Sequence, residues 1–246
     1  METNATTNVS QNEKLLYSQF RRKINTEAAR AQIRKLEYDL ADVRSGLNAL
    51  KTACQDANAL GLGAVCVMPC YVKQCSAFLG KNKKSSLVAC ISQPTGGDVT
   101  EVKVKAVKRA VKDGADEVDV AVPAAQVREG NYAYVRKEFK KLRSATKNKS
   151  LRVGLDCTLL TREEIVRVCS VAADCRVNCI KLAGLGGADR IADVKTAVKD
   201  KCTIKSEGAA TVLEMSGAVD LGATSVGSRN AADVARAILT AAQTEL

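Results

Sequence analysis

The 246-residue sequence contains no histidine. This absence excludes a Ser-His-Asp triad, a Cys-His pair, and any zinc or haem site that is held through imidazole. It also removes the side chain that most often moves protons near neutral pH. If the chain catalyses a reaction, its reactive groups must come from Lys, Asp, Glu, Cys, Tyr, Ser or Thr.

Aromatic residues are also scarce, because they make up 3% of the chain and tryptophan is absent. Hydrophobic residues nevertheless reach 46%, so the core must be packed with Ala, Val, Leu, Ile and Cys. Small and β-branched side chains of this kind suit parallel strands that are covered by helices.

Long hydrophobic segments are missing as well. No apolar run approaches the roughly 18 residues of a membrane span, and the polar start METNATTNVSQNE lacks the apolar centre of a signal peptide. The ten cysteines form no CxxC pair, and Cys66, Cys90, Cys169 and Cys179 lie inside apolar runs. We therefore expect reduced, buried cysteines, no metal site, no membrane contact and a cytoplasmic location.

Basic residues are in excess, and the formal net charge is +11. This balance favours anionic partners such as phosphorylated metabolites. The densest basic stretch, Arg136–Lys149, has helical spacing and is expected to be a solvated outer helix face. A nucleic acid partner is not expected, because aromatic residues are not interleaved with the charge.

Short apolar runs alternate with longer segments of helical spacing along the chain. The runs cover residues 64–68, 86–91, 116–122, 151–156, 178–183, 202–206 and 224–228. The helical segments before, between and after these runs cover residues 47–59, 99–113, 132–145, 161–174, 188–200, 209–218 and 230–243. Strands that alternate with helices predict an α/β fold with a parallel sheet.

The length fits a TIM (β/α)8 barrel, which needs about 250 residues. The eighth strand must then come first, near Leu36–Leu40. We expect a disordered segment over 1–13, a helical extension over 14–35, and a single barrel domain over 36–246. A doubly wound open sheet is the alternative fold, but no glycine-rich fingerprint follows the first strand.

Two expected strands each carry a lysine within an apolar or neutral run, Lys181 and Lys205. Each could lie at a strand end and extend its ammonium group to water. If both instead point into one barrel mouth, they should lower each other's pKa, which would make an amine able to attack a carbonyl. Asp119 lies mid-strand with Glu117 on the same face, where either acid would need a cationic partner.

Glycines follow the last three expected strands at Gly184, Gly186, Gly187, Gly208 and Gly227. Glycine lets backbone N–H groups approach an anion, and the loops after the last barrel strands often hold phosphate. Loops are commonly rich in glycine, so this pattern alone does not decide between a phosphate site and ordinary turns.

The stretches AVCVMPCYV (64–72), TEVKVKAVKRAVKDGADEVDVAVPAAQVREGN (100–131) and LRVGLDCTLLTREE (151–164) resemble the deoxyribose-phosphate aldolase family, class I aldolases with a (β/α)8 barrel. The resemblance implies cleavage of 2-deoxy-D-ribose 5-phosphate to glyceraldehyde 3-phosphate and acetaldehyde. It implies no metal or organic cofactor, a small phosphorylated sugar as substrate, and is compatible with a homo-oligomer.

The resemblance also implies roles for individual residues. Lys181 matches the lysine that forms the imine, Lys205 the lysine that perturbs its pKa, and Asp119 the acid of the proton relay. The residues that match or replace substrate contacts are Cys66, Asp39, Asp156, Gly184, Gly208, Gly227, Ser228 and Arg229.

The sequence departs from the family pattern around the expected mouth. Leu182 and Ala183 follow the imine lysine where the family has hydroxyl residues, and Glu207 brings a carboxylate to the expected phosphate loop. An offsetting cation such as Arg229 would then be needed. Three readings follow: a working deoxyribose-phosphate aldolase, a class I aldolase with another substrate, or a barrel that has lost activity and serves as a binding or scaffold protein.

Overall fold

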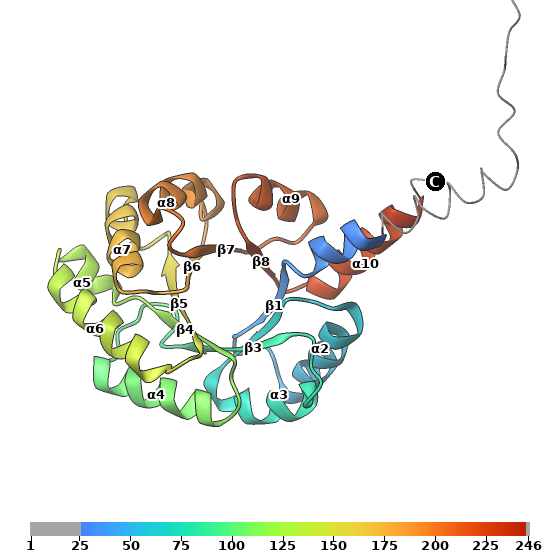
Figure 1. Cartoon of the computed structure of the whole chain (residues 1–246), viewed down its shortest axis with the longest axis horizontal. Helices are drawn as coiled ribbons and strands as arrows, with labels where there is room; N and C mark the ends of the chain where they lie inside the picture. The colour runs from blue at the N-terminus through green and yellow to red at the C-terminus, as the bar shows by residue number, and fades with distance from the viewer. Residues whose placement is uncertain (1–25, 245–246) are drawn as a thin grey trace, which may run out of the picture.

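The computed structural model describes residues 26–244, which form a closed parallel barrel with strands in sequence order (Figure 1). The strands are β1 Leu36–Leu40, β2 Ala64–Val67, β3 Ser86–Ile91, β4 Glu117–Ala121, β5 Ser150–Asp156, β6 Cys179–Ala183, β7 Thr203–Glu207 and β8 Ser225–Ser228. Closure through the β1–β8 pair confirms the TIM (β/α)8 barrel and excludes the open sheet.

Helices surround the barrel on its outside (Figure 1). They are α2 Leu47–Leu60, α3 Val72–Leu79, α4 Thr100–Lys112, α5 Ala124–Arg128, α6 Tyr132–Ala145, α7 Arg162–Asp174, α8 Ile191–Val198, α9 Val212–Asp220 and α10 Ala231–Thr244. Short 3-10 turns cover Pro69–Tyr71 and Ala188–Arg190. Helices α3 and α5 were not expected from the sequence. The expected segments 188–200 and 209–218 begin too early, because a 3-10 turn and a loop precede α8 and α9.

The main apolar core lies between the strands and the helices, where one face of each strand meets the buried stripe of a helix. Inside the barrel, by contrast, the apolar cluster is small and consists of Ala64, Cys66, Val88 and Cys90. Much of the remaining interior is occupied by charged side chains. A charged barrel interior is expensive to desolvate and therefore indicates a functional site.

Part of the predicted N-terminal extension can be compared with the structure. Residues 26–33 form a helix, in which Ala29 and Ile33 are buried in the main core. The helix lies beside α10 in Figure 1. The expected disordered segment 1–13 and the earlier part of 14–35 lie outside the described residues, so these predictions stay open.

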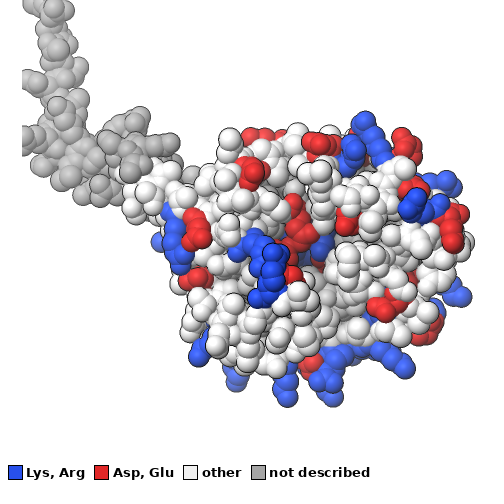
Figure 2. All heavy atoms as spheres, turned by 180° about the vertical axis from the view of Figure 1, so that it is seen from behind, with Lys and Arg blue, Asp and Glu red and all other residues white. Residues whose placement is uncertain are grey.

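The basic helix face lies on the outside of the molecule as expected. In α6, Lys137, Lys140 and Lys141 are exposed. Figure 2 shows a row of Lys and Arg side chains along its lower edge, where Figure 1 places α3 and α4. Over residues 26–244, no helix combines the length and the apolar character that crossing a membrane requires.

Candidate active site

The two predicted lysines lie on neighbouring strands at matching positions. Lys181 of β6 is the register partner of Lys205 of β7. Because side chains alternate along a strand, Lys181 and Lys205 enter the barrel interior while their apolar neighbours pack outward. Both lysines are buried, so neither is a strand-end lysine that extends into water.

Lys181 is paired with Asp119, and the Nζ–Oδ2 distance is 2.8 Å. Asp119 comes from β4, which also aims Glu117 inward as predicted. Burial would lower the pKa of Lys181, but Asp119, with smaller contributions from Cys90 and Asp39, raises the pKa above its ordinary value. The expected lowering of this pKa is therefore wrong for the resting site. The mutual repulsion of the two lysines is present, but it is weaker than the attraction of the carboxylate.

Lys205 is surrounded by acidic groups and one thiol. Its Nζ lies 3.1 Å from Glu37 Oε2, 3.8 Å from Asp39 Oδ2 and 3.3 Å from Cys66 Sγ. Burial would lower the pKa of Lys205, but these neighbours raise it well above its ordinary value. The pKa of the Cys66 thiol is also raised, and the thiol donates to Glu37 over 3.5 Å.

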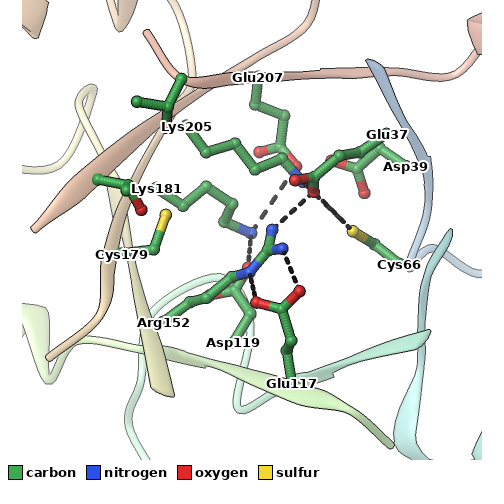
Figure 3. Close-up of polar contacts among 12 residues, drawn as sticks. Glu37, Asp39, Cys66, Glu117, Asp119, Arg152, Cys179, Lys181, Lys205 and Glu207 are labelled. Atoms are coloured by element: carbon green, nitrogen blue, oxygen red, sulfur yellow. Dashed lines mark hydrogen bonds and ion pairs between the residues drawn. The ribbon is translucent and has the colours of Figure 1, made fainter. Parts of the chain in front are cut away.

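An ion-pair network beneath the lysines was not predicted from the sequence. Arg152 of β5 bonds Glu37 of β1 over 2.6 Å and holds Glu117 of β4 through two bonds of 2.8 and 2.9 Å. Figure 3 shows Arg152 reaching across the barrel between these strands. Burial would raise the pKa of Glu37, but Lys205 and Arg152 together hold it well below its ordinary value. The network thus fixes the partner of Lys205.

Two interior glycines leave room for the lysine side chains. A Cβ atom at Gly154 would lie 2.8 Å from Lys181 Cε and 2.9 Å from Asp119 Oδ1. A Cβ atom at Gly227 would lie 2.9 Å from Lys205 Cε. These separations are shorter than van der Waals contact, so any larger residue would displace a lysine. Gly227 was predicted as a loop glycine near phosphate, whereas the structure places it in β8 beside Lys205.

Glu207 lies at the open end of the site. Its Oε1 is 3.7 Å from Lys181 Nζ, and its side chain is 23% exposed, against 5% for Lys181. In Figure 3 the ammonium group of Lys181 lies between Glu207 and Asp119. The carboxylate expected near a phosphate loop therefore faces the candidate imine lysine.

The other predicted substrate residues lie at or near the ends of strands. Asp156 accepts bonds from the backbone N–H and the hydroxyl of Thr158 in its own loop. Arg229 pairs with Asp42 rather than with Glu207, so it does not offset that carboxylate. The Ser228 hydroxyl accepts from the N–H of Asn230 over 3.0 Å. Their roles in substrate binding stay predictions.

Glycines close the turns after β6 and β7. Gly184 has φ +79° and Gly208 has φ +102°, a backbone region that L side chains rarely adopt. A Cβ atom at Gly184 would also come within 2.4 Å of an Asp156 oxygen. Both glycines line a cavity beside the site, and whether they bind substrate stays a prediction.

The cysteines and the described acids are the residues that could ligate a metal ion in this chain. All ten cysteines are free, and Cys66, Cys90, Cys169 and Cys179 are buried as predicted. In the part of the chain that the structure describes, no three His, Cys, Asp or Glu side chains converge in a way that could hold a metal ion.

A parallel barrel whose interior gathers two lysines and several carboxylates at one mouth has the architecture of a barrel enzyme. Comparison with known proteins shows to which enzyme family the chain belongs. The profile of the DeoC/LacD family aldolases matches residues 25–200. The chain belongs to this aldolase family, and its enzyme class is that of the carbon–carbon lyases.

Individual relatives agree with the family assignment. A deoxyribose-phosphate aldolase of Clostridium botulinum (Type A) is 34% identical over 181 residues, which cover 71% of this chain and 84% of the relative. One from Finegoldia magna is 32% identical over 165 residues, or 65% and 76% of the two chains.

Solved structures share the fold. QR15, an aldolase, superimposes with a TM-score of 0.79 at 23% identity, covering 85% of this chain and 96% of its own. A tetrameric deoxyribose phosphate aldolase from Aeropyrum pernix gives a TM-score of 0.74 at 16% identity and covers 92% and 97%. The resemblance noted in the sequence is thereby confirmed.

Proposed function

We propose that the protein cleaves 2-deoxy-D-ribose 5-phosphate reversibly to glyceraldehyde 3-phosphate and acetaldehyde through an imine on Lys181. The observation that carries the proposal is the buried Lys181–Asp119 pair, with Lys205 on the adjacent strand. A buried amine that is paired with a carboxylate has the two groups that Schiff-base chemistry requires, a nucleophile and a proton acceptor. The curated relatives named above support the choice of substrate.

The chemistry begins when the Lys181 amine gives up its proton, for which Asp119 is the nearest acceptor. The neutral amine adds to the C1 aldehyde, and loss of water gives a protonated imine. A base then removes the proton of the C3 hydroxyl, and the electrons of the C2–C3 bond flow into the imine. Glyceraldehyde 3-phosphate leaves, C2 of the enamine is protonated, and water releases acetaldehyde and the lysine.

Lys205 acts from the neighbouring strand without touching the reacting carbon. Its positive charge disfavours a second ammonium nearby and so opposes the attraction of Asp119 on Lys181. Glu37 and Cys66 hold Lys205 in place. A binding or scaffold protein would have no use for such buried charges, which supports catalysis over the inactive barrel.

The proposal is tested by trapping the imine with borohydride. Wild-type protein incubated with 2-deoxyribose 5-phosphate should carry a reduced adduct on Lys181, identified by peptide mass spectrometry. Lys181→Ala should lose both the adduct and aldolase turnover, with a rate loss of about 1,000-fold or more because the nucleophile is gone. Lys199→Ala, which alters a lysine after α8, serves as the matched control. Full aldolase activity in Lys181→Ala would refute the assignment of the nucleophile.

Two further expectations are part of the proposal. A cytoplasmic location agrees with free, mostly buried cysteines. Self-association is supported by the tetrameric form of the Aeropyrum pernix enzyme.

A further inference from the structure

A cavity of about 470 Å³ lies beside the site at the ends of β6 and β7. The glycine turns after these strands form much of its wall, and its charged residues are Asp189, Glu207 and Glu214. Within the described part of the chain, no Lys or Arg lines it. Because Glu207 lines this cavity and also contacts Lys181, the cavity adjoins the lysine site and offers space for the distal end of a substrate bound there.

The backbone donors of the turn after β7 are already occupied. The N–H groups of Gly208 and Ala209 donate to Gly227 O over 2.9 and 3.2 Å. Those of Ala210 and Thr211 donate to Glu214 Oε2 over 2.7 and 3.1 Å. The start of α9, which could otherwise bind an anion, therefore holds an anion of its own.

The negative charge in the cavity also disfavours the binding of an anion. The backbone bonds lower the pKa of Glu214, so its carboxylate stays ionised. Arg229, the cation that could have offset Glu207, is paired with Asp42. A phosphate dianion in this cavity would meet like charges and few open donors, whereas a hydroxyl group could donate to a carboxylate oxygen.

We propose that Glu207 is a specificity-determining residue which adapts this cavity to a substrate that ends in a hydroxyl group. A 5-phosphate on the substrate then raises kcat/KM only slightly. The inference rests on the proposed function and extends its substrate class to 2-deoxy aldoses that lack the phosphate. Glu214 contributes by occupying the donors at the start of α9.

The test compares kcat/KM for 2-deoxyribose 5-phosphate and for 2-deoxyribose in wild type and in Glu207→Gln. We expect the wild type to prefer the phosphate ester by less than about tenfold, and Glu207→Gln to raise this preference by about tenfold or more. Asp220→Asn removes the same charge from the other end of α9 and should leave the ratio unchanged. If Glu207 only positions Lys181, both substrates lose by the same factor and the ratio stays constant.

A wild-type preference for the ester above about tenfold, or a ratio that Glu207→Gln leaves unchanged, would overturn the proposal.

Titration with inorganic phosphate, followed by thermal shift, gives a readout that does not depend on turnover. We expect no saturable shift in wild type below about 10 mM and a measurable one in Glu207→Gln. Tight phosphate binding by the wild type also overturns the inference. Failure to cleave or trap either sugar refutes the proposed function, and the phosphate titration then still decides the inference.

Discussion

At the scale of single residues, the charge on Lys181 decides whether its amine can form the proposed imine. Its pKa lies above the ordinary value because Asp119, together with Cys90 and Asp39, more than offsets burial, so the amine is protonated near neutral pH. As long as the pH stays below the pKa, the neutral fraction of the amine rises about tenfold for each unit by which the pH increases. We predict that Asp119→Asn lowers the pKa of Lys181 and moves its reactivity toward lower pH. The measurement is the rate of Lys181 acetylation by acetic anhydride as a function of pH, followed by peptide mass spectrometry.

The Asp119→Asn substitution should affect turnover of the sugar differently from the reactivity of the Lys181 amine. Asp119→Asn also removes the nearest proton acceptor, so we expect cleavage of the sugar to fall even where Lys181 reacts faster. Asp220→Asn, a charge change far along α9, should alter neither curve. An acetylation profile for Asp119→Asn that coincides with the wild type, or lies at higher pH, would show that Asp119 does not set the pKa of Lys181.

The sequence was informative about residues that break a pattern. The inward positions of Lys181 and Lys205 could be predicted because each interrupts an apolar or neutral run, and that of Asp119 because it alternates with valines along its strand. Glu37 and Arg152 were missed because their bond joins residues that are 115 positions apart, which no local pattern encodes. The direction of the lysine pKa shifts was wrong for the same reason, since it depends on which carboxylates the barrel brings to each ammonium group.

At the scale of elements, Arg152 ties β5 to β1 through the buried carboxylate of Glu37 and to β4 through the partly buried carboxylate of Glu117. We predict that Arg152→Met lowers the free energy of unfolding by about 3–5 kcal/mol at neutral pH, because the buried Glu37 carboxylate loses this partner. Arg109→Met, which breaks an exposed pair with Asp113, should lose less than about 1 kcal/mol. Urea unfolding at pH 7 measures both.

The pH dependence of this loss has a defined sign. The pKa of Glu37 is lowered in the folded wild type, so its contribution to stability is present above its ordinary pKa and declines as pH falls below it. Without Arg152 the pKa of Glu37 should rise, and protonation then relieves the unpaired charge. The difference between wild type and Arg152→Met should therefore shrink from pH 7 to pH 4. A difference that grows on acidification would contradict this account.

Element positions were easier to predict than element ends. Seven strands lie where the apolar runs predicted them, and β1 lies at Leu36–Leu40, where the barrel required an eighth strand. Helix α5 was missed because its 5 residues are too few to show a helical period. The extent of α9 was misjudged because Thr211 and Glu214 cap its start, which leaves the preceding residues in a loop that lines the cavity beside the site.

At the scale of the whole molecule, charge is divided between two regions. The outer helices carry exposed lysines and arginines, while the barrel mouth gathers carboxylates around two ammonium groups (Figures 2 and 3). The net charge of +11 therefore describes the exterior and not the site. This separation explains why composition favoured an anionic ligand, whereas the cavity beside Lys181 is lined by acids. Net charge alone cannot locate a binding site, because it does not record which side of the barrel wall each residue occupies.

The role of the N-terminal helix, residues 26–33, could not be decided from the sequence. This helix was expected to be an extension outside the barrel domain, yet Ile33 is fully buried within the main core. We predict that Ile33→Ala lowers the free energy of unfolding by about 2–5 kcal/mol, or the melting temperature by roughly 4 °C or more. Gln32→Ala, at an exposed position of the same helix, should change little. Trapping of Lys181 at 25 °C should persist in both variants, because the site residues come from the strands. If Ile33→Ala had the same melting temperature as the wild type, packing of the helix against the core would not contribute to the stability of the barrel.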